Sequence, residues 1–302
     1  MTPSTDSHLV LDVPAPQVRR RAIDYLELTK PRIVVMVLIT TAAGFYLGAQ
    51  GSPNYLILLH TLIGTALTGG GTLALNQLME RHADALMTRT RNRPLPDGRL
   101  LPVDALVFGL ILTVSGIAYL VWASLWRSAF VTLLIAVTYL LMYTPLKQRT
   151  SLCSIVGAIP GALPPVIGWA AVRGSLGIEA WILFTIMFLW QVPHSLAIGW
   201  LYREDFAKAK FCLLPVIDPS GKATGRQVVL NCALLFLVGF LPVLVGFAGM
   251  WYGITAFLLG GLFFWYGVNF ARACSTATAR QLLFASLIYL PVILTALALD
   301  KL

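Results

Sequence analysis

The sequence predicts an all-α polytopic membrane protein, and three observations lead to this prediction. Hydrophobic residues make up 58% of the chain and charged residues only 12%, about half the charged share of a soluble domain. Apolar runs long enough to cross a bilayer, roughly 20 residues each, recur along the chain. The alternating pattern of a membrane β-barrel is absent, and lipid requires each spanning segment to satisfy its own backbone, so the runs are expected to be helices.

Nine apolar runs of spanning length follow one another after residue 30. They cover, in order, residues 32–49, 55–79, 102–122, 128–146, 152–172, 178–200, 228–248, 251–270 and 281–299. The fourth run closes with Tyr143-Thr144-Pro145-Leu146, and the proline is a typical stop signal. The fifth is rich in glycine and proline, with Gly157, Pro160, Gly161, Pro164, Pro165 and Gly168. A helix of that composition is expected to be bent or broken, which serves either a cavity wall or close packing against other helices.

The distribution of basic residues gives the predicted topology. With the N-terminus in the cytoplasm, all Lys and Arg residues except Arg127, Arg173 and Lys301 fall on the cytoplasmic side. This asymmetry follows the positive-inside rule and places the C-terminus outside. The net charge of +9 is therefore explained by topology and requires no nucleic-acid partner.

The first 22 residues differ from the rest in composition. Residues 1–22 are polar and are expected to form a disordered cytoplasmic tail, which leaves 23–302 as one intramembrane domain. No apolar run with a small-residue cleavage site precedes the first span. A bacterial inner membrane is the expected location, with a mitochondrial inner membrane as the alternative. The four cysteines show no C-x-x-C pairing and predict neither a zinc site nor a disulfide framework.

The end of the second span carries the most informative motif. Asn76, Glu80 and Asp84 are spaced four residues apart, so on a helix their side chains lie on one face. Acidic residues are costly near lipid and are rare in this chain. Oxygen ligands in such a row suit a hard cation such as Mg²⁺. Arg89 and Arg93, just beyond, suit phosphate oxygens. The pattern predicts a site for a metal-bound diphosphate, with a solvated salt-bridge cluster as the alternative.

A second acidic pair stands in the same orientation four spans later. Glu204 and Asp205 follow the sixth span, again on the cytoplasmic side and again followed by basic residues. The correspondence suggests a parallel internal repeat. If the repeat brings both loops together, the two acidic groups share one cavity mouth. We therefore predict nine helices around a central cavity that opens to the cytoplasmic face and to the bilayer.

Several further side chains are expected near this cavity. Lys147, which follows Tyr143 after the fourth span, lies at the same membrane level as Arg89 and Arg93. His194 and Gln191 lie within the sixth span, above the second acidic pair, and could share a polar pocket. Aromatic rings near the cytoplasmic halves of the helices could stabilise a cation, or simply pack: Tyr139, Tyr143, Trp190, Trp200 and Tyr202.

These groups allow a defined chemistry. Metal and cationic side chains neutralise a departing diphosphate, and departure from an allylic carbon leaves a carbocation that must be shielded from water. A membrane transporter is the alternative of a different class. Transporters usually carry ionisable residues near the midplane and paired broken helices, whereas these acidic residues lie at one face.

Over about residues 24–300 the chain resembles the UbiA-type intramembrane prenyltransferase superfamily. The specific matches are Asn76-Gln77…Glu80…Asp84…Arg89-Thr90…Arg93-Pro94, Tyr143-Thr144…Leu146-Lys147, Trp190-Gln191…Pro193-His194, and Asp205 with Leu214-Pro215. A glutamate at the middle position of the Asn76–Glu80–Asp84 motif is similar to the pattern of the haem-farnesylating branch. The chain departs from the family pattern at Cys153, Ser195, Phe206 and Lys210.

The resemblance implies an activity and residue roles. The implied donor is farnesyl diphosphate and the implied acceptor is the vinyl group of haem b, with haem O and diphosphate as products. Mg²⁺ would be held by Asn76, Glu80, Asp84 and Asp205, with Glu204 beside them, and the diphosphate by Arg89, Arg93 and Lys147. Asp84, Asp205 and Lys147 would be catalytic, and Tyr143, Gln191 and His194 would contact substrate. Acceptors such as an aromatic quinone precursor or chlorophyllide are the alternative. A haem A synthase or terminal oxidase assembly would be the downstream partner.

Overall fold

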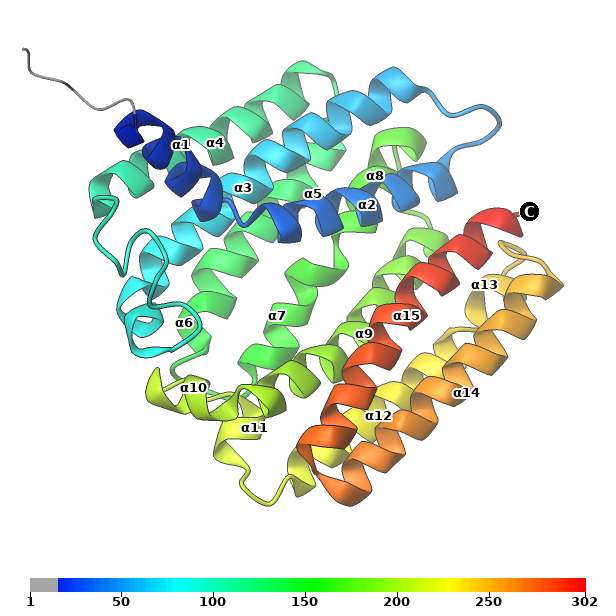
Figure 1. The fold of residues 1–302 in the computed structure, drawn as a ribbon. Coiled ribbons are helices and arrows are strands. Elements are labelled where there is room, and N and C mark those ends of the chain that lie inside the picture. The colour runs from blue at the N-terminus through cyan, green and yellow to red at the C-terminus, as the bar shows by residue number, and fades with distance from the viewer. Residues whose placement is uncertain (1–15) are drawn as a thin grey trace, which may run out of the picture.

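The protein is a bundle of membrane-length helices. The computed structural model describes residues 16–302, with side chains from Arg21 onward. Within that range nine helical segments are long and apolar enough to cross a membrane, which confirms the predicted all-α, nine-span architecture (Figure 1).

The helices in chain order are α1 (Pro16–Leu28), α2 (Pro31–Gly48), α3 (Tyr55–Leu86), α4 (Pro102–Trp122), α5 (Trp126–Val137), the π-helix η1 (Thr138–Tyr143), α6 (Thr144–Leu146), α7 (Cys153–Ala162), α8 (Pro164–Arg173), α9 (Ile178–Leu201), α10 (Arg203–Lys208), α11 (Leu214–Ile217), α12 (Lys222–Val238), α13 (Leu241–Leu244), α14 (Met250–Ala273) and α15 (Thr276–Leu299). Three spans are composite: α5 with η1 and α6, α7 with α8, and α12 with α13.

Two boundaries differ from the prediction. The second span was expected to end at residue 79, but α3 continues to Leu86, so the polar motif is part of the helix. The predicted tail covers 1–22, and residues 1–15 lie outside the described residues. Helix α1 begins at Pro16, so the end of the predicted tail is helical.

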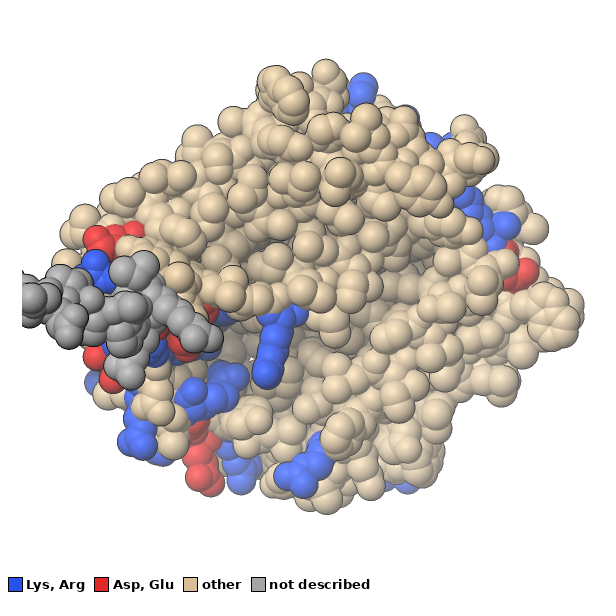
Figure 2. Space-filling model, turned by 45° about the horizontal axis from the view of Figure 1, so that its top comes forward, with Lys and Arg blue, Asp and Glu red and all other residues tan. Residues whose placement is uncertain are grey.

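The spans form two halves (Figure 1). Helices α2 to α5 and α8 lie in one half, and α9, α12, α14 and α15 in the other, with α7 between them. The short elements α6, α10 and α11 gather at one end of the bundle. Figure 2 shows that most charged side chains of the face drawn gather at one end, with a smaller group at the opposite end and few between them. This distribution is that of a protein surrounded by lipid.

The glycine- and proline-rich span is broken, as predicted. It ends as α7 at Ala162 and resumes as α8 at Pro164, because prolines cannot donate backbone hydrogen bonds. A Cβ on Gly168 would lie 1.9 Å from the carbonyl oxygen of Thr41, and one on Gly44 would lie 2.0 Å from that of Pro165. Helices α2 and α8 therefore pack backbone to backbone, as small residues allow in membranes.

The end of the chain is tied to two other spans. The Oδ2 atom of Asp300 accepts a 2.7 Å hydrogen bond from the backbone N–H of Tyr252 at the start of α14. The ammonium of Lys301 donates to the carbonyls of Tyr46 and Ala49 at the end of α2. These contacts connect the first span to the last two.

Candidate active site

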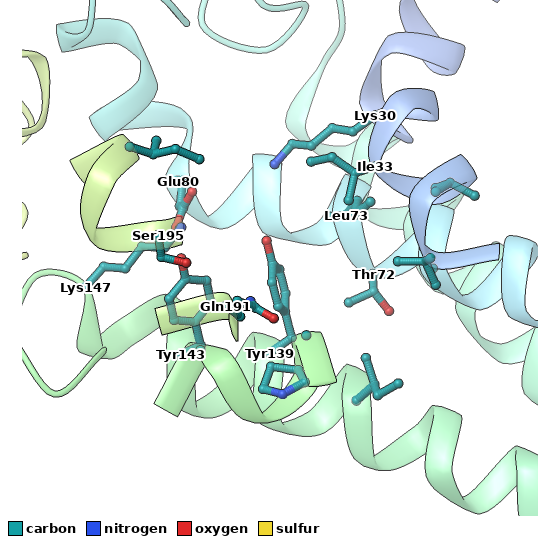
Figure 3. A pocket seen from close by; sticks show the side chains of 18 of the residues that line it. Lys30, Ile33, Thr72, Leu73, Glu80, Tyr139, Tyr143, Lys147, Gln191 and Ser195 are labelled. Carbon is teal, nitrogen blue, oxygen red and sulfur yellow. The ribbon is translucent and has the colours of Figure 1, made fainter. Parts of the chain in front are cut away.

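One cavity of about 450 Å³ lies inside the bundle. Its wall is contributed by α2, α3, the composite span of α5 and η1, α7, α8 and α9, and by the loops at the charged end. Four cations and two carboxylates line it: Lys30, Arg89, Arg93, Lys147, Glu80 and Asp84. The rest of the lining is mostly apolar or carries hydroxyl groups. Figure 3 shows Glu80 and Lys147 together on one side of this space, with the ammonium of Lys30 reaching toward them from the other side and Thr72 farther away.

Each member of the predicted motif on α3 is paired with a cation. Lys147 Nζ lies 2.6 Å from Glu80 Oε1, and Arg93 Nη1 lies 2.7 Å from Asp84 Oδ2. Lys30 Nζ donates to Asn76 Oδ1 at 2.9 Å. The spacing of four residues therefore places all three side chains on one buried face, as predicted. Glu80 and Asp84 line the cavity, whereas Asn76 lies behind its wall and also donates to Thr144 Oγ1.

One oxygen of the motif has no partner. Asp84 is 1% exposed, and its Oδ1 makes no hydrogen bond within the described part of the chain. A buried carboxylate oxygen without a donor is costly. Across residues 16–302 no cluster of three or more His, Cys, Asp or Glu side chains is already arranged as a metal site. Nevertheless, the free Oδ1 of Asp84 beside Glu80 is the donor set that a hard divalent cation prefers.

The second acidic pair reaches the loop after α3 through Asp205, which is not itself among the residues that line the cavity. Its Oδ1 and Oδ2 accept hydrogen bonds from the backbone N–H groups of Thr88 and Arg89, at 3.3 and 3.2 Å. Desolvation raises the pKa of Asp205, but these bonds and those from the side chains of Thr88 and Lys208 outweigh it and lower the pKa. The ends of the second and sixth spans therefore meet, as the sequence predicted.

Aromatic rings hold two of the cations at the mouth. The guanidinium of Arg89 lies 5.1 Å from the ring centroid of Tyr202 and 5.6 Å from that of Phe206. The ammonium of Lys147 lies 4.5 Å from the ring of Tyr143 and 5.6 Å from that of Phe211. Cation–π contacts of this kind orient a cation without neutralising it. Arg89 therefore keeps its charge for an anionic ligand, whereas Lys147 also pairs with Glu80.

The π-helix and the glycines of α7 shape the middle of the cavity. Short π-helical segments are frequent at functional sites, and both Tyr139 and Tyr143 of η1 line the cavity. A Cβ on Gly157 would lie 2.5 Å from the ring of Tyr143, and one on Gly161 would lie 2.1 Å from the amide of Gln191. The glycines therefore make room for these two side chains, which confirms α7 as a cavity wall.

Some predicted site residues lie elsewhere. Glu204 is exposed and makes no hydrogen bond or ion pair among the described residues. His194 is not part of the lining, because its ring is bonded to Ser286 on α15. Trp190 is stacked on His194, Trp200 packs against Phe270, and Tyr202 lies under Arg89. Of the five aromatic candidates, only Tyr139 and Tyr143 line the cavity.

Lys30 is a site residue that sequence reasoning missed. It was counted only as a basic residue of the cytoplasmic side, although its place directly before Pro31 at the start of the first span is a usable signal. The backbone of Lys30 is left-handed, with φ of 50°, and its ammonium points into the cavity (Figure 3). Burial, together with repulsion from Arg93, lowers the pKa of Lys30 to about 7, against the attraction of Glu80.

The bundle and its charged cavity define an integral membrane protein with a site for an amphiphilic anion. The sequence profile described as the UbiA prenyltransferase family matches residues 37–288. A protein named protoheme IX farnesyltransferase from Solibacter usitatus is 44% identical over 287 residues, which are 92% of this chain and 98% of that protein. Proteins of the same name from Koribacter versatilis and Synechococcus elongatus are 41% and 40% identical over 96% and 99% of this chain, and 97% and 94% of theirs. The chain belongs to the UbiA prenyltransferase family.

Solved structures agree on the fold. A structure described as digeranylgeranylglyceryl phosphate synthase superposes with a TM-score of 0.76 at 18% identity, over 93% of this chain and 98% of the other. A UbiA homolog from Archaeoglobus fulgidus bound to GPP and Mg²⁺ superposes with a TM-score of 0.63 at 15% identity, over 91% of this chain and 99% of that one. The protein is thus a multi-pass membrane enzyme of the prenyltransferase class.

Proposed function

We propose that this protein transfers a farnesyl group from farnesyl diphosphate to a vinyl group of haem b and gives haem O. The acceptor and donor are supported by full-length relatives at 37–44% identity, all named protoheme IX farnesyltransferase. One bond breaks, between the farnesyl C1 and the diphosphate oxygen, and one carbon–carbon bond forms at the vinyl terminus. Water then adds to the resulting cation as a hydroxyl group, and its proton is released.

The observation that supports the donor site best is the unpartnered Oδ1 of Asp84 at a mouth lined by four cations. We assign Mg²⁺ to Glu80 and Asp84, with Asp205 bonded to the backbone of the loop that follows α3; when bound, the metal would neutralise charge on the leaving diphosphate. Asn76 orients the site from behind the wall through Lys30. Glu204 is left as a solvated neighbour of Asp205.

The cations of the mouth are assigned to the diphosphate. Lys147 and Arg93 pair with Glu80 and Asp84, so they are held where a phosphate oxygen can compete for them. Arg89 and Lys30 complete the set. Fixed cations aimed at a leaving diphosphate stabilise the charge that develops in the transition state.

The inner part of the cavity is assigned to the prenyl chain and its cation. Ile33, Leu73 and Pro160 are among its apolar lining residues, and an apolar wall excludes the water that would quench a carbocation early. The rings of Tyr139 and Tyr143, with centroids 5.2 Å apart, present electron-rich faces to the same space.

We place the protein in a bacterial inner membrane, with the N-terminus and the charged mouth in the cytoplasm. The basic residues predicted outside lie together at the opposite end: Arg127 beside Gly174, and Arg173 within electrostatic reach of Lys301. Haem O released into that membrane would then pass to a haem A synthase or to terminal oxidase assembly.

A direct assay tests the function. The purified full chain is incubated with haem b, farnesyl diphosphate and Mg²⁺, and the haem products are separated and weighed by mass spectrometry. The expected product is haem b plus one farnesyl group and one hydroxyl group. A parallel reaction with 4-hydroxybenzoate tests the quinone-precursor alternative, and prenylation of that acid but not of haem would contradict the proposal.

A further inference from the structure

A groove of about 290 Å³ lies between α7, α9 and α12, apart from the cavity described above. Leu214 of α11 forms part of its wall, and α11 lies at the charged end of the bundle (Figure 1). Leu152 and Leu230, which also line the groove, are 58% and 53% exposed. The groove therefore opens onto the outer surface of the bundle, at the level where the apolar spans meet the charged end.

The groove is polar at one end and apolar below it. Arg226 and Gln227, near the start of α12, and Ser151, just before α7, line the polar end. Val192 and Leu196 of α9 are buried and line the apolar part. Val192 is nine residues before the end of α9, which places it about 13 Å below that end. A lining of this kind fits a molecule with a polar head and a hydrocarbon chain.

Arg226 keeps its charge free for a ligand. Its side chain is exposed and makes no ion pair or hydrogen bond within the described part of the chain. Asp218 is the sole acidic residue of residues 206–299, and its carboxylate accepts hydrogen bonds from Ser220 and Thr224 instead. A guanidinium with free N–H groups is a usual partner of phosphate oxygens.

We propose that this groove binds an anionic phospholipid, with its phosphate at Arg226 and one acyl chain along Val192 and Leu196. The polar side chains of the lining are a guanidinium, an amide and two hydroxyls, all of which can donate hydrogen bonds, and none of the lining residues is acidic. The quaternary ammonium of phosphatidylcholine would find no carboxylate there, so a headgroup without a cation is favoured. Basic pockets between transmembrane helices bind anionic headgroups in this way.

The groove and the cavity share a wall. Ser154 of α7 lines both spaces. On α9, Gln191 and Ser195 line the cavity, whereas their neighbours Val192 and Leu196 line the groove. A lipid in the groove therefore supports the two helices from behind the reacting groups, and turnover should depend on it. Lipid binding is independent of the proposed function, whereas the effect on turnover rests on it.

Lipid affinity tests the site. Binding of phosphatidylglycerol to the delipidated full chain in detergent is measured by native mass spectrometry for the wild type, Arg226→Gln and the control Arg272→Gln. Arg272, near the end of α14, is also exposed but does not line the groove. We expect Arg226→Gln to lose affinity roughly fivefold, as for one arginine at a lipid headgroup, and Arg272→Gln to match the wild type. Equal affinities in all three proteins would overturn the proposal.

A second variant tests the groove as well as its charge. Ala223→Trp retains Arg226 but places a large side chain in the groove, from an exposed position in the first turn of α12 where the fold should tolerate it. Phosphatidylglycerol binding should fall as it does in Arg226→Gln. In the wild type, phosphatidylcholine with the same acyl chains should bind more weakly. Wild-type lipid affinity in folded Ala223→Trp, checked by circular dichroism, or equal affinity for both lipids, would contradict the assignment.

Turnover in nanodiscs connects the lipid with the reaction. Farnesyl transfer to haem b is compared in phosphatidylcholine alone and with phosphatidylglycerol added. The anionic lipid should stimulate the wild type and Arg272→Gln but not Arg226→Gln. A raised KM for haem b in Arg226→Gln, with unchanged lipid binding, would overturn the lipid assignment in favour of the acceptor carboxylates. Absence of farnesylated haem in every protein would refute the proposed function and leave the binding result standing.

Discussion

Asp84 combines burial, negative charge and one unpartnered oxygen, and these properties make it the most sensitive carboxylate of the site. Asp84→Asn keeps the size of the side chain and removes the charge. We expect turnover to fall at least 100-fold, since removal of a single group that stabilises developing charge has that effect, with the fold retained. Asp97→Asn, in the loop that follows α3 and with a side chain that is 51% exposed, is the control. Near-normal turnover of Asp84→Asn with saturating Mg²⁺ would rule out the role of Asp84 as a metal ligand.

Arg93 and Arg91 form a matched pair of basic residues in one loop. Arg93 lines the cavity, whereas Arg91 is exposed and makes no ion pair within the described chain. Arg93→Ala should weaken donor affinity by about 2–5 kcal/mol, as for a buried charge pair, and part of this loss comes from leaving Asp84 without a cation. Arg91→Ala should change little. Both effects are measured as the KM for farnesyl diphosphate. Equal KM values for the two variants would argue against the assignment of Arg93 to the diphosphate.

Lys30 predicts a pH dependence of donor binding. Its pKa, lowered by burial to about 7, means that the charged form predominates below pH 7 and is lost above it. Donor affinity should therefore fall as pH rises, by roughly fivefold between pH 7 and 8 if binding requires the charge. Lys30→Arg stays charged and should flatten this profile. The affinity for farnesyl diphosphate is measured for both proteins over pH 6–9. An identical pH dependence in the two proteins would show that the charge of Lys30 does not control donor binding.

The α7 helix offers a test of how the cavity is shaped. Gly157→Ala adds a Cβ that collides with the ring of Tyr143, although alanine is the better helix former. Displacing the ring should cost about 1–3 kcal/mol, which as a barrier means roughly 5- to 150-fold in rate. Gly261→Ala, on α14, has its nearest neighbour at 4.0 Å and serves as control. Both variants should remain folded, so a rate loss shared equally by the two would contradict the argument.

The sequence predicts the spans well because each depends on local composition. It also predicts the face shared by Asn76, Glu80 and Asp84, because helical spacing alone fixes that face. What it could not predict depends on distant partners. Lys30 meets Asn76 across two helices, and His194 turns to Ser286, 92 residues away. The sequence did not predict helix α1, because its composition resembles that of a polar tail. Its helical structure depends on packing against α3, which local propensity does not describe.

The end of the bundle opposite the charged mouth should contribute to overall stability. Helix α14 has Gly249 at its N-cap and no capping side chain of its own, so Asp300 supplies the cap from the last span. Asp300→Ala should therefore cost about 1 kcal/mol. For a chain of this size that corresponds to a lower thermal midpoint by about 2 °C, measured by scanning fluorimetry in detergent. His82→Ala, an exposed residue of α3, should leave the midpoint unchanged.

The contact between α2 and α8 also sets an order of events during biosynthesis. Thr41 and Gly44 meet Pro165 and Gly168, which are translated roughly 120 residues later, a delay on the order of 10 s at usual elongation rates. Throughout that interval the first span stands in the bilayer with its small-residue stripe unmatched. Nascent chains released before α8 has emerged therefore lack the partner that α2 requires, and they should be substrates for membrane quality-control proteases.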